Sequence, residues 1–304
     1  MNSEKKEIFI SEEEKGLRLD KLLTSKFPDE SRTHLKRMIE DGRVTVNGEV
    51  YKTSHKVQAG EKIEIKEIQP VLIDLKPQKM DLEILYEDDD ILVINKPAGL
   101  LVHPAGKRCE NTLANALVYH FGKLPSLGDE YRLGIVHRLD EGTSGLMIIA
   151  KTEHALRKIS DQFKERVVKK EYTALVKGII QADEGAVDAP IGRHYKKRQR
   201  MMVKYVSSRE AETYWKVTER FKESTLVTLM PKTGRTHQIR VHMSYLGHPI
   251  LGDKEYGIKA PPLTHQALCA TYIGFYHPQK KEFIEFKIDL PEDFKKQIEI
   301  EKSK

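Results

Sequence analysis

Cysteine is scarce in this sequence, and long apolar runs are missing. Only two cysteines occur among 304 residues, Cys109 and Cys269, and they form no CxxC pair. Neither a disulfide framework nor a thiolate zinc site can be built from them. No stretch of about 18 consecutive apolar residues is present, which excludes a membrane-spanning helix. The opening stretch, MNSEKKEIFISEEEKG, is charged and has no apolar signal core, so we expect a cytoplasmic protein.

Short motifs for metal and nucleotide chemistry are missing as well. His237, His242 and His248 gather in one segment, but the first two are five residues apart and would point about 140° apart on a helix. A zinc pair on one helix face needs a spacing of four, and no HExxH or DxD-like cluster accompanies these histidines. The Gly-Thr-rich stretches DEGTSG and KTGRT do not match the P-loop pattern, and a dinucleotide fingerprint is absent. We therefore expect neither a metal nor a nucleotide cofactor.

Positive charge is in excess, and much of it lies in one segment. The formal net charge is +6 and the isoelectric point is near 9. Residues 193–209, RHYKKRQRMMVKYVSSR, carry seven Lys or Arg and no acid. Such a segment can be a solvated loop without a partner, but uncompensated positive charge repels itself. A polyanionic partner, whose counterions are released on binding, is the favoured explanation.

The chain divides by composition and pattern into four segments. Residues 14–66 have the pattern of a small unit of helices and short strands. Residues 67–80 hold two prolines and no clear period, which is typical of a linker. Residues 81–291 are rich in strand patterns with scattered helices. Residues 292–304 are charged, and we expect them to fray as a C-terminal tail.

The first segment combines two amphipathic helices with a hairpin turn. Apolar residues recur at helical spacing in RLDKLLTSKF and in SRTHLKRMIEDGRV, where Ser31 is a good N-cap and Gly42 ends the helix. RVTVNGEV alternates and turns at Asn47-Gly48, a strong hairpin signal. A generic helix-hairpin module is one explanation, but the pattern resembles the S4 RNA-binding domain. That resemblance implies an RNA-contacting basic face made by Arg32, Lys36, Arg37 and Arg43.

Strand patterns outnumber helical patterns in residues 81–291. ILVINKPAG, GLMIIAK, KEYTALVKG, ETYWKVTERF and STLVTLMP have the pattern of strands, whereas NTLANALVYHFG and TEHALRKISDQFKERVV have that of helices. Hairpin-length connections outnumber helical crossovers. The segment is therefore predicted to have an α+β fold with a mostly antiparallel sheet.

Asp140 is a candidate functional residue because it adjoins an apolar strand. It follows Arg138 by two residues, and an extended segment 136–140 would place both side chains on one face. Taken alone, Asp140 could equally be a turn or cap residue beside Gly142.

A second candidate, Arg240, lies on a predicted helix that begins at a Thr236 cap and ends at Gly247. Ile239, Met243 and Leu246 would form the buried stripe of this helix. An arginine beside such a stripe either reaches solvent with its tip or needs a carboxylate partner.

Five motifs occur in one order along the chain and together carry a family resemblance. They are KPAGLLVHP, GIVHRLDEGTSGLMIIAK, KKEYTALVKG, GRTHQIRVHMSYLGHPILGD and QALCATYIGFYHP. They resemble the catalytic domain of the RluA-type pseudouridine synthases, preceded here by an S4 domain. Within that family, the sequence is most similar to the ribosomal large-subunit enzymes of the D type.

The resemblance implies an isomerase that converts uridine in RNA to pseudouridine without metal or cofactor. It implies that Asp140 is the catalytic aspartate, acting as nucleophile or by stabilising a sugar intermediate. It implies that Tyr172 stacks on the target base and removes the C5 proton, and that Arg240 pairs with the aspartate. Arg138 would displace the base from the RNA and Leu268 would line the pocket. The further residues expected to bind substrate are Arg193, Lys197, Arg198 and Arg235.

Two positions depart from the usual family pattern. Cys269 stands where ALHA is usual, and HPA replaces HPG. The expected partner is ribosomal RNA of the large subunit or its precursor particle, and the expected state is a monomer. Two alternatives stay open: a synthase that acts on transfer RNA or another RNA, and a non-catalytic RNA-binding assembly factor that retains the fold.

Overall fold

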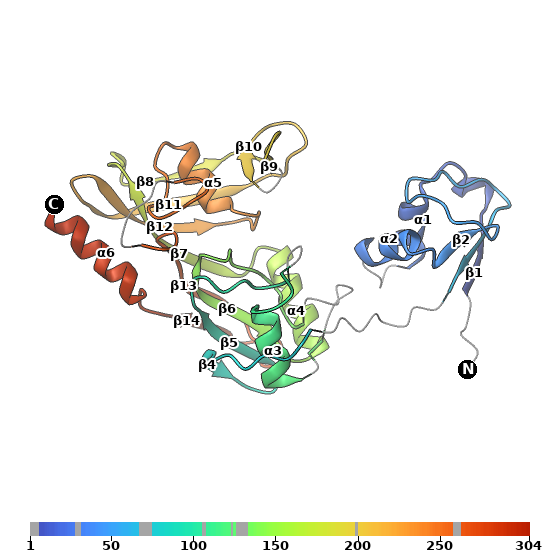
Figure 1. Cartoon of the computed structure of the whole chain (residues 1–304), viewed down its shortest axis with the longest axis horizontal. Helices are drawn as coiled ribbons and strands as arrows, with labels where there is room; N and C mark the ends of the chain where they lie inside the picture. Colours follow the sequence, from blue (N-terminus) through green and yellow to red (C-terminus); the bar gives the residue numbers. More distant parts are fainter. Residues whose placement is uncertain are drawn as a thin grey trace. The chain divides into compact units, whose positions relative to one another are not determined.

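A computed structural model of the chain describes residues 6–27, 32–66, 75–104, 108–122, 124–125, 133–197, 200–257 and 263–304. The chain divides into two compact units, Met1–Leu75 with Ser126–Leu133, and Lys76–Pro125 with Gly134–Lys304 (Figure 1). Within the described ranges, no helix has the length and apolar character needed to cross a bilayer.

The first unit is a three-stranded antiparallel sheet packed against two helices. Its strands lie in the order β1-β3-β2. Its elements are β1 (Lys6–Phe9), a 3-10 turn (Glu12–Glu14), α1 (Leu19–Lys26), α2 (Arg32–Glu40), β2 (Val44–Val46) and β3 (Lys62–Ile65). The apolar stripes predicted for both helices are buried in one core, which contains Leu22, Leu23, Leu35, Met38, Ile39, Val44 and Ile63.

The tight turn predicted at Asn47-Gly48 is present, and both residues have positive φ, 50° and 84°. The strand that pairs with β2 does not follow this turn directly. It is β3, which begins 16 residues after Val46, and β3 also pairs with β1. The sheet of this unit therefore includes a strand, β1, that lies before residue 14. β1 was missed because only one of its four residues, Ile8, has a partly buried side chain. The predicted cap Ser31 lies outside the described residues.

The second unit is built on a mixed sheet of nine described strands. Their order is β4-β5-β6-β13-β7-β12-β11-β8, with β14 paired to β13. All pairs are antiparallel except β13 with β6, which agrees with the predicted α+β class and mostly antiparallel sheet. The strands are β4 (Glu83–Glu87), β5 (Ile91–Lys96), β6 (Ser144–Ala150), β7 (Lys169–Lys177), β8 (Glu184–Asp188), β11 (Glu212–Arg220), β12 (Ser224–Pro231), β13 (Leu268–Tyr276) and β14 (Phe283–Lys287).

Four helices and a small hairpin surround this sheet (Figure 1). They are α3 (Leu113–Phe121), α4 (Glu153–Lys164), α5 (Gln238–Tyr245), α6 (Glu292–Ser303) and the hairpin of β9 (Ile191–Arg193) with β10 (Met201–Val203). α3 begins at Thr112, whose hydroxyl accepts a hydrogen bond from the Asn115 amide, and ends at Gly122. α4 is capped in the same way by Thr152. Both helices are where the sequence predicts them.

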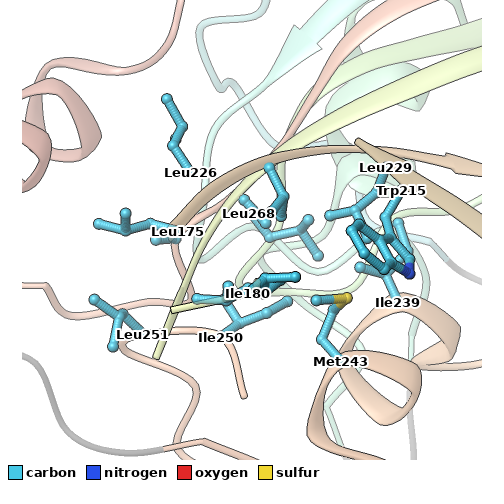
Figure 2. Close-up of a cluster of buried hydrophobic side chains, with 14 of the residues drawn as sticks. Leu175, Ile180, Trp215, Leu226, Leu229, Ile239, Met243, Ile250, Leu251 and Leu268 are labelled. Carbon is cyan, nitrogen blue, oxygen red and sulfur yellow. The ribbon is translucent and has the colours of Figure 1, made fainter. Parts of the chain in front are cut away.

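A core of buried side chains holds α5 against the sheet (Figure 2). Ile239 and Met243 of α5 pack among residues of β7, β12 and β13, including Leu175, Leu229 and Leu268. Complete burial of one such side chain stabilises the fold by roughly 1.5–3 kcal/mol. The position of α5, and of any polar residue on it, is therefore set by packing.

The start of α5 and the burial of Leu246 differ from the prediction. The N-cap is His237, in the left-handed conformation with φ 55°, and its side chain makes no capping hydrogen bond. Thr236 is therefore not the cap. Ile239 and Met243 are buried, but Leu246 is 37% exposed because it lies past the last residue of the helix.

The expectation of a frayed tail at residues 292–304 is wrong. These residues form α6, whose Phe294 and Ile298 belong to the core cluster of the second unit. Glu301 is buried on the same face and accepts a hydrogen bond of 2.8 Å from the Ser224 hydroxyl. Phe294, Ile298 and Glu301 recur at intervals of four and three and therefore lie on one face of the helix, which packs against the core of the second unit.

Candidate active site

Six of the residues named from the sequence line one cavity in the second unit. The cavity has a volume of about 110 Å³ and lies beside α5, between the loop that precedes β6 and the strands β7 and β13. The six residues are Arg138, Asp140, Tyr172, Arg235, Arg240 and Leu268.

Asp140 sits in a tight turn before β6. The Thr143 amide donates to the Asp140 carbonyl at 3.0 Å. The preceding segment 136–140 forms no strand, so strand alternation does not place Arg138 and Asp140 on one face. His137 anchors the segment instead, because its Nε2 accepts a hydrogen bond of 2.9 Å from the Ile148 amide of β6. Arg138 is exposed at the rim of the cavity.

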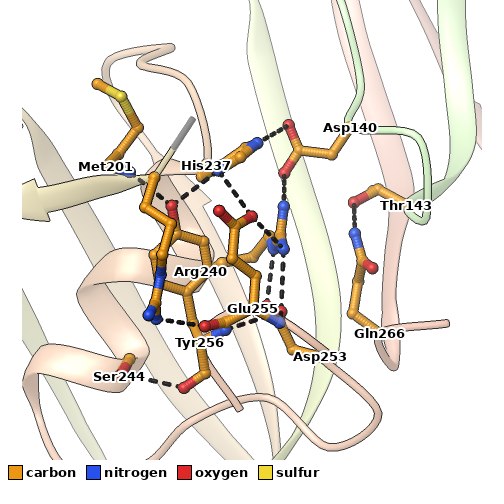
Figure 3. A network of polar contacts seen from close by, with 11 residues as sticks. Asp140, Thr143, Met201, His237, Arg240, Ser244, Asp253, Glu255, Tyr256 and Gln266 are labelled. Carbon is orange, nitrogen blue, oxygen red and sulfur yellow. Dashed lines mark hydrogen bonds and ion pairs between the residues drawn. The ribbon is translucent and has the colours of Figure 1, made fainter. Parts of the chain in front are cut away.

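Arg240 is the centre of a buried ion network (Figure 3). Its Nη1 donates to Asp140 Oδ2 at 3.0 Å. Its Nε and Nη2 donate to the two carboxylate oxygens of Asp253 at 2.7 and 2.9 Å, and Nη2 also lies 3.3 Å from Glu255 Oε2. The Arg240 side chain is 8% exposed and that of Asp253 is fully buried. The guanidinium also lies 5.0 Å from the centroid of the Tyr256 ring.

The electrostatics of the Arg240–Asp253 pair keep both residues charged. Burial alone would lower the pKa of Arg240, but hydrogen bonding to Asp253 and the charges of Asp140 and Asp253 raise it above its usual value. Burial would raise the pKa of Asp253, but its bonds to Arg240 outweigh this effect, and the pKa is lowered. Asp140 therefore faces a permanent cation across 3.0 Å.

His237 and Tyr256 join this network to strand β10. The Met201 amide of β10 donates to the Tyr256 oxygen at 2.7 Å, and the same oxygen lies 2.8 Å from His237 Nδ1. Because the oxygen already accepts from Met201, its own hydrogen can be donated to Nδ1. Burial lowers the pKa of His237, which favours the neutral ring; the second nitrogen of that ring is Nε2. That nitrogen faces Asp140 Oδ1 at 4.0 Å.

Arg200, next to Met201, adds a second link between the hairpin and the network. Its guanidinium donates to the Glu255 carbonyl and lies 5.0 Å from the centroid of the Tyr256 ring. The basic segment is thus tied to the residues that hold Arg240.

Tyr172 and Leu268 come from neighbouring strands. Tyr172 of β7 is opposite Ala270 of β13, and Leu268 is opposite Ala174. Burial, with the charge of Asp140 as a second cause, raises the pKa of Tyr172 well above its usual value, so the side chain is a neutral phenol. Leu268 is 4% exposed and supplies an apolar wall.

Lys96 is a buried residue beside the site that the sequence did not reveal. Its ammonium donates to the carbonyls of Pro97, Leu100 and Glu141, at 2.8, 2.9 and 3.2 Å. Burial lowers its pKa to about 8, against the opposing charges of Asp140 and Glu141. Lys96 therefore ties the turn after β5 to the turn that carries Asp140.

The structure also adds His237, Asp253, Glu255 and Tyr256 to the residues predicted from sequence. The sequence did carry a signal for Asp253. An arginine on a buried helix stripe needs a carboxylate, and Asp253 is the last residue of the motif GRTHQIRVHMSYLGHPILGD that contains Arg240. His237 and Tyr256 carried no such signal, because their roles depend on contacts with β10.

Other predicted residues lie away from the cavity. Arg193 and Lys197 belong to the β9–β10 hairpin and are exposed, and Arg198 lies outside the described residues. In the first unit, Lys36 is exposed and lies 3.5 Å from Glu40. Arg43 follows α2 and is partly buried. The Arg32 and Arg37 side chains are outside what the structure describes, although both residues lie on α2.

Cys269, at one of the two positions that depart from the family pattern, is buried in β13. Burial raises its pKa to about 11, so it is a neutral thiol. The other position, Ala105, is not among the described residues. Within those residues, no group of three or more His, Cys, Asp or Glu is arranged to hold a metal ion.

Comparison with known proteins gives matches over both units. The family model described as RNA pseudouridylate synthase matches residues 90–245, and the S4 domain matches residues 17–63. The uncharacterized RNA pseudouridine synthase YlyB of Bacillus subtilis is 44% identical over 294 residues, covering 96% of this chain and 97% of that protein. Ribosomal large subunit pseudouridine synthase D of Pseudomonas aeruginosa is 42% identical, covering 92% and 90%. Among solved structures, human RNA pseudouridylate synthase domain containing 1 is 30% identical with a TM-score of 0.58, covering 71% of this chain and 86% of that one.

Proposed function

Because the chain belongs to the RNA pseudouridylate synthase family, with an S4 domain in front, we propose that it isomerises uridines of large-subunit ribosomal RNA. Members of this family are isomerases that act on RNA. The proposal on the substrate is supported by similarity to the D-type enzyme, which extends over 92% of this chain and includes the S4 unit. We propose that it acts in the cytoplasm as a monomer.

The reaction balances without an added reagent. The N1–C1′ bond breaks and its electron pair goes to the uracil. The uracil turns in place, C5 forms a bond to C1′, C5 loses a proton and N1 gains one. The site must therefore stabilise charge at the sugar, hold a detached ring and move one proton.

The contact between Asp140 and Arg240 is the observation that supports this chemistry most directly. The Arg240 guanidinium donates to the Asp140 carboxylate at 3.0 Å, at the wall of the cavity, and a neighbouring cation favours the charged form of an acid. An ionised Asp140 can attack C1′ or stabilise a positively charged sugar. Asp253 and Glu255 neutralise the remaining charge of Arg240, so that the arginine can stay in a mostly buried site.

Tyr172 and Leu268 are suited to hold the detached uracil. An aromatic face contributes roughly 1–3 kcal/mol by stacking on a base, and stacking permits rotation in the plane of the ring. We propose that the Tyr172 hydroxyl also takes the C5 proton. Because burial and the charge of Asp140 raise the pKa of Tyr172, the side chain is a neutral phenol, and it must release its own proton as it takes the one from C5. Arg138, at the exposed rim, is placed to enter the space that the extruded base leaves in the RNA.

A pseudouridine map of ribosomal and transfer RNA from cells lacking this protein tests the proposal. Specific pseudouridines should disappear from the large-subunit RNA, return with the wild-type gene, and stay absent with Asp140→Asn. Purified Asp140→Asn should bind RNA within several-fold of the wild type. An intact large-subunit map with losses in transfer RNA would overturn the proposed substrate, and restoration of the sites by Asp140→Asn would overturn the role of Asp140.

A further inference from the structure

Three arginines from distant segments converge around Glu210, beside the catalytic cavity. Arg235, in the turn before α5, donates from Nε to the Glu210 carbonyl at 2.8 Å. Arg166, just after α4, approaches the Glu210 carboxylate at 4.0 Å. Arg209 immediately precedes Glu210 and is held by two backbone hydrogen bonds to Ile191 of β9. The three arginines are 26 to 69 residues apart in the sequence, so the tertiary structure brings them together.

The positive charge of this group is not balanced by its acids. The neighbouring Lys232 pairs with Glu212 at 3.2 Å. Counting Arg166, Arg209, Arg235 and Lys232 against Glu210 and Glu212 leaves two positive charges. Burial and the charges of Arg209 and Arg166 together lower the pKa of Arg235. A cluster of like charges raises the local concentration of counter-ions and so favours an anionic ligand.

We propose that Arg166, Arg209 and Arg235 form a phosphate-binding site that holds the RNA backbone next to the nucleotide entering the cavity. This inference rests on the function proposed above and adds a site outside the catalytic residues. Arg166 and Arg209 are exposed, whereas Arg235 also lines the cavity. An RNA strand whose uracil occupies the cavity must leave its phosphates at the cavity mouth. Arg235 lies there and belongs both to the cavity lining and to the arginine cluster.

Guanidinium groups are suited to this ligand. Arginine offers a planar fork of donors that matches the oxygens of a phosphate, and it stays charged at any working pH. Arg235 is anchored through Nε, which leaves its terminal nitrogens for a ligand. The Arg166 side chain is 48% exposed and the Glu210 side chain is 88% exposed, and they lie 4.0 Å apart. An exposed ion pair of this kind is weak, so a phosphate can replace Glu210 as the partner of Arg166.

The test removes the two exposed charges and leaves Arg235 in place. We would measure binding of in vitro transcribed large-subunit ribosomal RNA at salt concentrations from 0.1 to 1 M. Each lost contact with a single strand lowers the slope of log affinity against log salt by about 0.7. R166Q/R209Q should therefore bind about 25-fold more weakly than wild type at 0.1 M salt and almost equally at 1 M. KM should rise while kcat at saturating RNA is kept.

Two control variants isolate the effect of charge at this place. R157Q/K158Q removes two exposed positive charges from α4 and should leave the slope unchanged. R166K/R209K keeps the charge and should retain the salt slope, which also shows that the fold tolerates substitution here. An unchanged slope for R166Q/R209Q, or an equal fall for R157Q/K158Q, would overturn the site. Failure of the wild-type enzyme to modify this RNA would instead overturn the proposed substrate. The salt slopes of the wild type and the variants would still show whether Arg166 and Arg209 bind phosphate.

Discussion

Asp253 accepts two hydrogen bonds from Arg240, at 2.7 Å from Nε and 2.9 Å from Nη2, and this leaves Nη1 directed at Asp140 (Figure 3). A planar guanidinium held by two of its nitrogens has little freedom to rotate. The orientation of the arginine that faces Asp140 is therefore set by a residue that does not line the cavity. Asp253 is a positioning residue.

Asp253→Asn should destabilise the protein and slow turnover. Removing one partner of a buried ion pair leaves an uncompensated charge and typically costs 3–5 kcal/mol. The free energy of unfolding from urea titration should fall by about that amount. Glu255→Gln is the matched control, because this side chain is 27% exposed and its loss should cost about 1 kcal/mol or less. Single-turnover assays at saturating RNA should show a lower rate for Asp253→Asn, and a wild-type rate would argue against the positioning role.

Tyr172→Phe should separate base stacking from proton transfer. The ring remains, so RNA binding should stay within several-fold of wild type, but the C5 proton has no acceptor and the reaction should stop after bond cleavage. Tyr172→Ala also removes the stacking surface and should bind more weakly by roughly 1–3 kcal/mol. Single-turnover assays with filter binding measure both effects. If Tyr172→Phe forms pseudouridine at the wild-type rate, the hydroxyl is not the base.

Tyr256→Phe should lower kcat without raising KM. The variant removes the hydroxyl that connects the Met201 amide to His237 and leaves two polar groups without this partner. An unmade buried hydrogen bond costs roughly 1–3 kcal/mol, which corresponds to about a 5- to 150-fold loss in kcat if the network positions Asp140. Tyr214→Phe, which loses a surface contact with Lys232, is the control and should act like wild type. A raised KM with normal kcat would show that Tyr256 serves binding alone.

His137 should make stability depend on pH in the acid range. Burial, with the charge of Lys170 as a second cause, lowers the pKa of His137 to about 3. In the unfolded chain it is about 6.5. Between these values the unfolded state binds more protons, so the contribution of His137 is complete above pH 6.5 and is lost as the pH falls below it.

Unfolding of wild type and His137→Gln at pH 7.5 and pH 5 measures this contribution. Glutamine can still accept the hydrogen bond from the Ile148 amide but does not titrate. The wild type should lose about 2 kcal/mol more than the variant over this interval. The carboxylates titrate alike in both proteins and cancel in the comparison. Identical pH dependence would mean that folding does not lower the pKa of His137.

Features with short-range signals could be predicted from the sequence. Thr112 and Gly122 bound α3, and Asn47-Gly48 forms the turn after β2, because caps and turns are decided within a few residues. The candidate set of Asp140, Tyr172 and Arg240 came from motifs that resemble a known family. The structure places all three at one cavity.

Tertiary structure decided which polar residues meet and which charged segments are buried. α6 looked like a solvated tail because the benefit of burying Phe294 and Ile298 exists only once a core is present to receive them. Arg240 reaches Asp140 across 100 residues, and Arg166 reaches Glu210 across 44. A charged side chain is stabilised or destabilised mainly by the polar and charged groups within a few ångströms of it. In this protein, the order of the strands in the sheet determines which groups those are.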